Sequence, residues 1–164
     1  MEFYPWIVLA HVVFVIVAFG AHGTSAFAMF QARRDPDRTR LAAVLDLSQA
    51  SLGIAGVALL LAVLLGIVAA IMGGHFGRLW PWAAIGIVIA VFAVMTPVGA
   101  NPMGELRRAL GMSGRGDKPG DPPRQPGTDA DVQAAQARLR PELLTIIGVL
   151  ALAVLVWLME AKPF

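Results

Sequence analysis

The chain has 164 residues, of which 57% are hydrophobic and 15% are charged, and its mean hydropathy is +0.70. A soluble domain needs a polar surface, so this composition excludes one and indicates a membrane protein. The formal net charge is +2 and there is no cysteine, which excludes disulfides, thiolate metal sites and iron–sulfur clusters. Any redox chemistry would therefore need a bound cofactor.

Four apolar segments are long enough, or nearly so, to cross a hydrocarbon core of about 30 Å. They cover about residues 4–30, 48–74, 80–98 and 143–159. We expect an all-α fold, an integral membrane four-helix bundle, with three of the helices and their short loops within residues 1–110. The first segment lacks the basic leader of a signal peptide, so we expect it to remain as a helix.

A helix start is predicted between the first two segments, at Asp35-Pro36-Asp37. Asp35 is placed to cap free backbone amides, Pro36 suits the first helical turn, and Asp37 is favourable near the positive end of the helix dipole. The second helix is therefore expected to begin near residue 36, before the membrane boundary.

Residues 111–128, GMSGRGDKPGDPPRQPGT, are rich in glycine and proline and carry too little apolar surface to offset the entropy of ordering them. We expect a flexible cytoplasmic linker here, between the third and fourth membrane helices. Thr128 and Asp131 then have the spacing of a capping box, which predicts a short cytoplasmic helix at the start of residues 129–164. Because of Pro141, the fourth membrane helix either starts afresh there or continues with a kink.

The charges predict the direction in which the helices cross the membrane. Of the 13 basic residues, 11 lie in residues 31–47 and 99–142, on one side, whereas two lie on the side of the termini. By the positive-inside rule, the large loop is cytoplasmic and both the N-terminus and the C-terminus lie on the outer side of a bacterial inner (cytoplasmic) membrane. The aromatic residues Tyr4, Trp6, Trp80, Trp82 and Trp157 agree, because all fall at predicted outer helix ends, where such rings prefer the headgroup layer. This topology accounts for the pI of about 9.7 without nucleic acid as a partner.

Two histidines, His11 and His22, lie within the first apolar segment, where polar side chains are costly and usually face the bundle interior. Their spacing returns to nearly the same helix face, about 16 Å further along the axis. Such a pair suits a cofactor or a proton path. A depth comparison finds no second strong axial ligand, although Thr96, Asn101 or Glu142 could hydrogen-bond His22. Neutral imidazoles that only bond a neighbouring helix, contributing on the order of 1 kcal/mol, explain the pair equally well.

Three cofactor roles are open for His11: a single axial ligand to haem, a ligand shared with a second copy of the chain, or a metal ligand. The turn IMGGHFG, residues 71–77, places Met72 and His75 where they could approach His11. Thioether and imidazole donors suit copper, so Met72 and His75 are candidate metal ligands. The alternative for His75 is that it is solvated in an exposed loop.

The acidic residues and the motifs limit the other functions. All eleven acidic residues lie in loops, tails or helix ends, so no carboxylate at mid-membrane is available to couple transport to protons. No Walker loop, nucleophile elbow or zinc-protease motif occurs in the sequence. An enzyme that acts without a cofactor is therefore not expected, and whether the chain is an enzyme is left open.

The segment PWIVLAHVVFVIVAFGAHGTSAFAMFQARRDPDR resembles small bacterial polytopic membrane proteins with a domain of unknown function, which are distantly similar to CopD and HemJ-type proteins. The shared pattern is a histidine in the outer half of the first helix, here His11, then a glycine, here Gly20, then a basic turn, here Arg33 and Arg34. The resemblance covers about residues 4–110. It implies haem association and porphyrinogen oxidation in the HemJ case, or copper handling in the CopD case. No helix-core lysine matches a HemJ-type functional lysine, so only His11 is carried over, as an axial ligand.

The leading hypothesis is a haem- or metal-associated membrane redox protein that uses His11, with His22 as the second candidate. One alternative is a non-catalytic structural or accessory subunit of a larger membrane complex, in which the histidines only pack. A third is a small oligomeric pore or carrier. In each case the chain contacts the lipid bilayer and is expected to form a homo-oligomer or to join a membrane complex.

Overall fold

The computed structural model describes residues 2–113, 117, 122 and 124–163. Within these ranges the chain forms helices and turns and contains no strand. The α-helices are α1 (Tyr4–Ala32), α2 (Arg38–Met72), α3 (Trp80–Met95), α4 (Asn101–Ala109), α5 (Asp129–Ala137) and α6 (Pro141–Ala161). A 3-10 turn, η1 (His75–Gly77), precedes α3, and a π-helical turn, η2 (Thr96–Ala100), joins α3 to α4.

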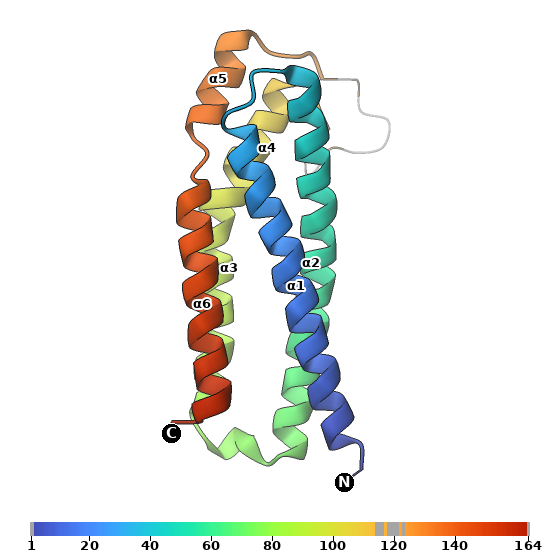
Figure 1. Cartoon of the computed structure of the whole chain (residues 1–164), viewed down its shortest axis with the longest axis vertical. Coiled ribbons are helices and arrows are strands. Elements are labelled where there is room, and N and C mark those ends of the chain that lie inside the picture. Colours follow the sequence, from blue (N-terminus) through green and yellow to red (C-terminus); the bar gives the residue numbers. More distant parts are fainter. Residues whose placement is uncertain (1, 114–116, 118–121, 123, 164) are drawn as a thin grey trace.

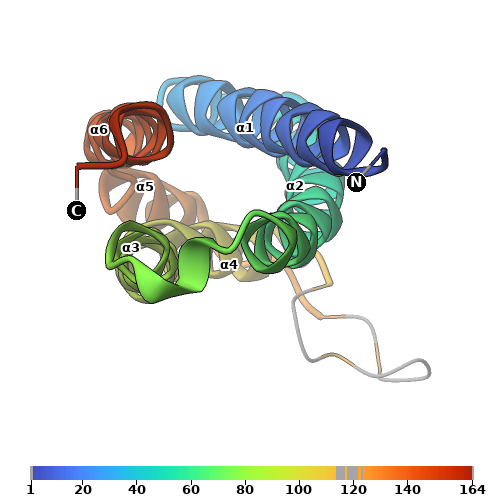
Figure 2. The same ribbon diagram turned by 90° about the horizontal axis from the view of Figure 1, so that it is seen from below.

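Four helical stretches are long and apolar enough to cross a membrane, which confirms the predicted all-α architecture of a multi-pass membrane protein. They contain α1, α2, the run from α3 to α4, and α6. Seen from one end, the helices follow one another around a ring in the order α1, α2, α3 and α6 (Figure 2). Both termini lie at the same end as η1, and α5 lies at the opposite end (Figure 1). Which of these ends faces the cytoplasm stays a prediction.

The start of α2 differs from the prediction, because the capping residue is Asp37 rather than Asp35. The Asp37 carboxylate accepts hydrogen bonds from the backbone amides of Thr39, at 2.8 Å, and Arg40, at 3.4 Å. Asp35 instead accepts from the amide of Asp37, at 2.9 Å. Pro36 has no N–H to donate, so the nearest amide that the Asp35 carboxylate meets belongs to Asp37. Asp35 therefore shapes the turn, and Asp37 begins the helix.

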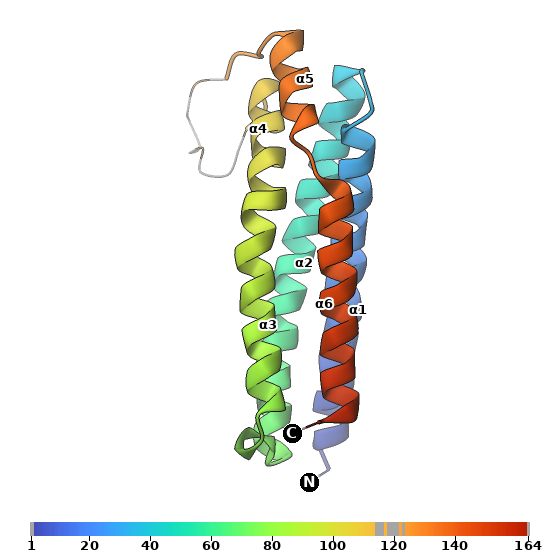
Figure 3. The same cartoon turned by 90° about the vertical axis from the view of Figure 1, so that its left-hand side faces the viewer.

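The third membrane helix continues past its predicted end near residue 98 and reaches Ala109 as an almost unbroken rod (Figure 3). Two prolines, Pro97 and Pro102, remove backbone donors along this run and interrupt the regular ladder of hydrogen bonds. The wide π turn η2 absorbs the interruption without ending the helix. The Thr96 hydroxyl also donates to the Phe92 carbonyl, at 3.0 Å, which supports the chain where the geometry changes.

The predicted capping box is observed at the start of α5. The Thr128 hydroxyl accepts from the Asp131 amide at 3.2 Å, and the Asp131 carboxylate accepts from the Thr128 amide at 2.8 Å. α5 ends before Pro141, so α6 starts afresh rather than continuing with a kink. Residues 114–116, 118–121 and 123 of the predicted linker lie outside the described residues, so its flexibility stays a prediction.

The end of the bundle that carries α4 and α5, here called the basic end, has a closely packed core. Its buried side chains come from α1, α2, α4, α5, α6 and the α5–α6 connection: Met29, Ala32, Leu41, Leu45, Met103, Leu106, Val132, Ala135, Leu139 and Leu144. The Gln136 amide of α5 donates to the backbone carbonyls of Ala32, at 2.7 Å, and Asp35, at 2.8 Å. α5 is thereby fixed across the turn between α1 and α2.

Ion pairs surround this core and connect helices that are far apart in the sequence. Arg33, directly after α1, pairs with Glu142 of α6 at 2.8 Å, and Arg107 of α4 pairs with Asp46 of α2 at 2.9 Å. A third pair joins Arg38 to Asp129 at 2.6 Å. Exposed pairs of this kind contribute little stability individually, so the buried apolar side chains dominate here.

The opposite end, which carries the termini and η1, packs in two separate pairs of helices. α1 lies against α2 along its length, and α3 lies against α6 around Trp80, Ala84, Leu155 and Leu158. Three tryptophans, Trp6, Trp82 and Trp157, are exposed, as expected for rings in a headgroup layer. Trp80, the first residue of α3 at this same end, is only 8% exposed and belongs to the cluster with Ala84.

The core of the basic end can be tested with a pair of leucines. Leu139, in the α5–α6 connection, is fully buried, whereas Leu143, in the first turn of α6, is 44% exposed. Leu139→Ala is expected to lower the free energy of unfolding by about 2–5 kcal/mol, as is usual for buried leucines. Thermal unfolding of the detergent-purified protein would measure this loss. If Leu143→Ala, the control, destabilised the protein as much, the basic end would not be the packed core described here.

Candidate functional site

His11 bonds the neighbouring helix. Its Nδ1 lies 2.7 Å from the backbone carbonyl oxygen of Ala62 in α2. A carbonyl only accepts, so Nδ1 carries the proton and donates. The ring also lies over Gly66, where a Cβ would be 3.0 Å from the Cε1 atom of His11. The imidazole therefore fills the space left by a glycine in the α1–α2 contact, as expected for a histidine that packs.

His22, eleven residues further along α1, is in a different situation. Its Nε2 atom is buried and has no hydrogen-bond partner among the described residues. A Cβ built on Gly148 of α6 would lie 3.5 Å from Nε2 and 3.8 Å from the terminal methyl of Met95, so Nε2 lies against the backbone of α6. Thr96 and Glu142, two partners expected for it, bond elsewhere: Thr96 donates to Phe92, and Glu142 pairs with Arg33.

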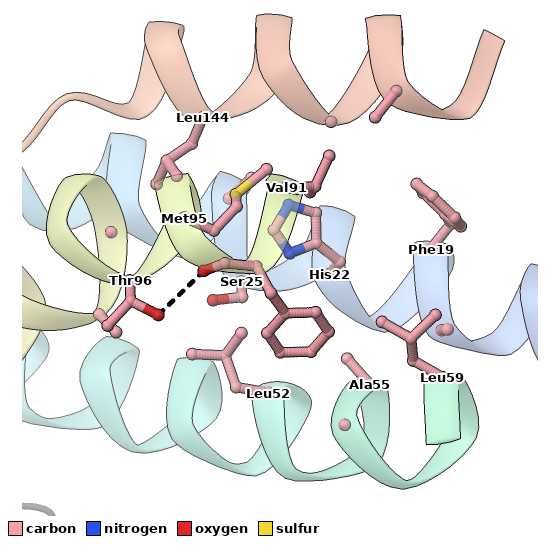
Figure 4. Close-up of a pocket in the computed structure, with 18 of the residues that line it drawn as sticks. Phe19, His22, Ser25, Leu52, Ala55, Leu59, Val91, Met95, Thr96 and Leu144 are labelled. Atoms are coloured by element: carbon pink, nitrogen blue, oxygen red, sulfur yellow. Dashed lines mark hydrogen bonds between the residues drawn. The ribbon is translucent and has the colours of Figure 1, made fainter. Parts of the chain in front are cut away.

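The ring of His22 lies in a cavity of about 240 Å³ between the helices, with side chains of α2 and α3 around it (Figure 4). Of the side chains that line this cavity, only His22, Ser25 and Thr96 are polar. The Ser25 hydroxyl is buried and bonds that of Ser48 in α2 at 2.7 Å, and the Thr96 hydroxyl bonds its own helix. Among these three, His22 alone has an unpaired polar group.

A second buried nitrogen, Nε1 of Trp80, also has no partner among the residues that the structure describes. Trp80 does not line the cavity, and its ring lies against the α3–α6 cluster. Both nitrogens are therefore buried and unpaired, but only His22 is a residue that lines the cavity.

The two histidines do not form one site, although they share a face of α1 as predicted. α1 runs obliquely through the bundle (Figure 1), so the same face meets different helices at different depths. Near His11 it meets α2, and near His22 it meets α3 and α6. His11 does not line the cavity.

The candidate metal ligands Met72 and His75 lie at the turn between α2 and α3. The His75 ring packs against Trp80 with ring centroids 5.5 Å apart, and its Nε2 lies close to Gly73. Within the described ranges, no three His, Cys, Asp or Glu side chains come together as a metal site. Whether Met72 and His75 bind copper stays a prediction.

Sequence reasoning overlooked two features of the cavity, namely Met95, which contacts the space around His22, and the bonded pair Ser25 and Ser48. The serines carry a weak signal, since each is a small polar residue within an apolar helix. Their pairing depends on how α1 and α2 cross, which the sequence alone does not show.

The geometry defines the class of this chain as a multi-pass, four-helix membrane protein with a cavity between its helices. No known protein family, curated protein or solved structure matches it. The family resemblance therefore rests on the quoted residues alone, and the cavity carries the functional argument.

The packing role of His11 can be tested with a double-mutant cycle. His11→Ala should lower the free energy of unfolding by about 1 kcal/mol, the typical value of such a bond between membrane helices. Gly66→Ala should also destabilise the wild-type protein, because its methyl meets the imidazole, but should be nearly neutral in His11→Ala. Gly20→Ala, whose Cβ meets no atom within 4 Å, is the control. Additive effects in thermal unfolding would contradict the contact.

The unpaired nitrogen of His22 predicts that replacing this residue stabilises the protein, whereas replacing His11 destabilises it. A buried polar group without a partner costs on the order of 1–3 kcal/mol, and phenylalanine has a similar ring without that group. In protein stripped of small molecules, His22→Phe should therefore unfold at a higher temperature than the wild type. A lower unfolding temperature would show that the imidazole has a partner in the free protein.

Proposed function

We propose that this protein binds a small organic ligand or cofactor inside the membrane, with His22 as the polar group that holds it. The observation that carries the proposal is a histidine that lines the cavity and whose buried Nε2 atom has no partner among the described residues. Polar side chains inside a membrane are costly and mark functional sites by default. A ligand that bonds His22 would offset this cost.

We therefore favour His22 over His11 as the residue that binds a ligand or cofactor. The Nδ1 atom of His11 is bonded to a carbonyl, and its ring lies against α2 rather than beside open space. An axial ligand needs room for its cofactor on the side of the ligating nitrogen. His22 lines such a space, although its Nε2 atom lies against α6.

The cavity favours a group smaller than haem. Its volume of about 240 Å³ is below the roughly 300 Å³ at which pockets for drug-sized ligands begin. A porphyrin is larger than such ligands, so the helices would have to separate to admit one.

The donors around the cavity also favour an uncharged ligand over copper. Three methionines, Met29, Met95 and Met103, line the cavity with His22. Met29 and Met103 belong to the packed core of the basic end, which leaves Met95 as the thioether beside the imidazole. Within the part of the chain that the structure describes, no carboxylate lines the cavity to balance the charge of a metal ion. A neutral organic molecule needs neither further thioether donors nor a carboxylate to balance its charge.

The proposal is tested by asking what the protein carries when it is purified from its native membrane in mild detergent. Solvent extraction with mass spectrometry should find one organic molecule in near-stoichiometric amount in the wild type and in His11→Ala. The same molecule should be lost in His22→Ala, because only that variant removes the polar contact. An absorption spectrum and elemental analysis on the same samples should show neither haem nor stoichiometric metal.

Two results would contradict the proposal. A Soret band or a stoichiometric metal that disappears in His11→Ala would restore the redox role of His11. A protein without any bound molecule that co-purifies with a larger partner would favour the accessory-subunit alternative.

A further inference from the structure

The cavity is open on one side of the bundle. The cavity-lining residues Ser25, Gly148 and Ala151, on α1 and α6, are buried, so the cavity is closed on that side. On the opposite side, Leu52 of α2 is 38% exposed and Phe92 of α3 is 53% exposed, and both line the cavity. α1 packs on α2 and α3 packs on α6, whereas α2 and α3 share few contacts or none. The opening therefore lies between α2 and α3.

Buried side chains line both ends of the cavity. Met103 and Leu144 of the packed basic end line it on one side, and Leu155 of the α3–α6 cluster lines it on the other. The surface outside the opening is apolar, with the exposed side chains Leu60, one turn after Gly56 on α2, and Ile89, three residues before Phe92 on α3. A molecule that reaches His22 therefore comes from the hydrocarbon phase rather than from water.

We propose that the cavity takes a lipid-soluble molecule from the bilayer through the opening formed by Leu52, Gly56 and Phe92. The inference rests on the proposed function of His22 and names the class of its ligand. A neutral imidazole has one donor and one acceptor, so it suits a hydroxyl or carbonyl group. The small cavity suits a single ring, and a hydrocarbon tail would leave through the opening. The ligand is therefore a one-ring phenol or quinone with an apolar tail.

A matched pair of glycines on α2 tests the opening. At both Gly53 and Gly56 a Cβ meets no atom within 4 Å, so a large side chain fits at either position. Gly56 lines the cavity and Gly53 does not. Gly56→Trp would obstruct the opening, whereas Gly53→Trp adds the same ring to the helix surface away from it.

The experiment uses the full chain in phosphatidylcholine vesicles with a dodecylphenol that carries an aliphatic diazirine. Photolabelling of cavity peptides is followed over time by mass spectrometry. The wild type and Gly53→Trp should label equally, and Gly56→Trp should label at least tenfold more slowly. Phe92→Ala, which removes a side chain from the rim, should label faster than the wild type, so the test does not depend on whether Gly56→Trp folds.

His22→Phe, measured in parallel, distinguishes an error in the assigned opening from an error in the proposed His22 site. If His22→Phe abolishes labelling while Gly56→Trp and Phe92→Ala label at the wild-type rate, the opening is assigned wrongly and the His22 site stands. If His22→Phe labels like the wild type, the proposed function itself is overturned.

Discussion

The structure depends on the packed core of the basic end, because this is where the helices of the bundle are held together. Leu41, Leu106 and Leu139, from three different parts of the chain, are fully buried in one cluster there. Further along the bundle the helices pack as two pairs, α1 with α2 and α3 with α6. The cavity lies between these pairs. The packed core holds the four helices together at one end, and beyond it the two helix pairs are separated. The space between the pairs opens between α2 and α3.

Among the described residues, two buried side-chain nitrogens depart from the rule that the other polar groups named here follow, namely Nε2 of His22 and Nε1 of Trp80. In hydrocarbon an unpaired polar group is costly, so such groups find partners on their own or adjacent helices. His11 bonds α2, Ser25 bonds Ser48, and Thr96 bonds its own helix. His22 faces the cavity and has no partner among the described residues. Of the two, only His22 lines the cavity, and the proposed ligand site is based on this combination.

The sequence predicted the number and composition of the membrane helices. In a membrane no water bonds the backbone, so a long apolar segment forms a helix, in which its own N–H and C=O groups bond one another. Local signals were less complete. The capping box at Thr128 was found, but the cap of α2 was placed at Asp35 instead of Asp37, and the continuation through Pro97 was missed. Both histidines were recognised as candidates, but their roles depend on the oblique course of α1, which decides that one faces a helix and the other a cavity. Periodicity along a single helix does not contain that information.

The most direct test is nuclear magnetic resonance of the protein with ¹⁵N-labelled histidine in nanodiscs, since the chain has only three histidines to assign. In protein stripped of small molecules, Nδ1 of His11 should show a hydrogen bond, and the ring nitrogens of His22 should show none. Adding the dodecylphenol should shift the nitrogens of His22 and leave those of His11 and His75 unchanged. A hydrogen-bonded His22 in the stripped protein, or a shift confined to His11, would contradict the account.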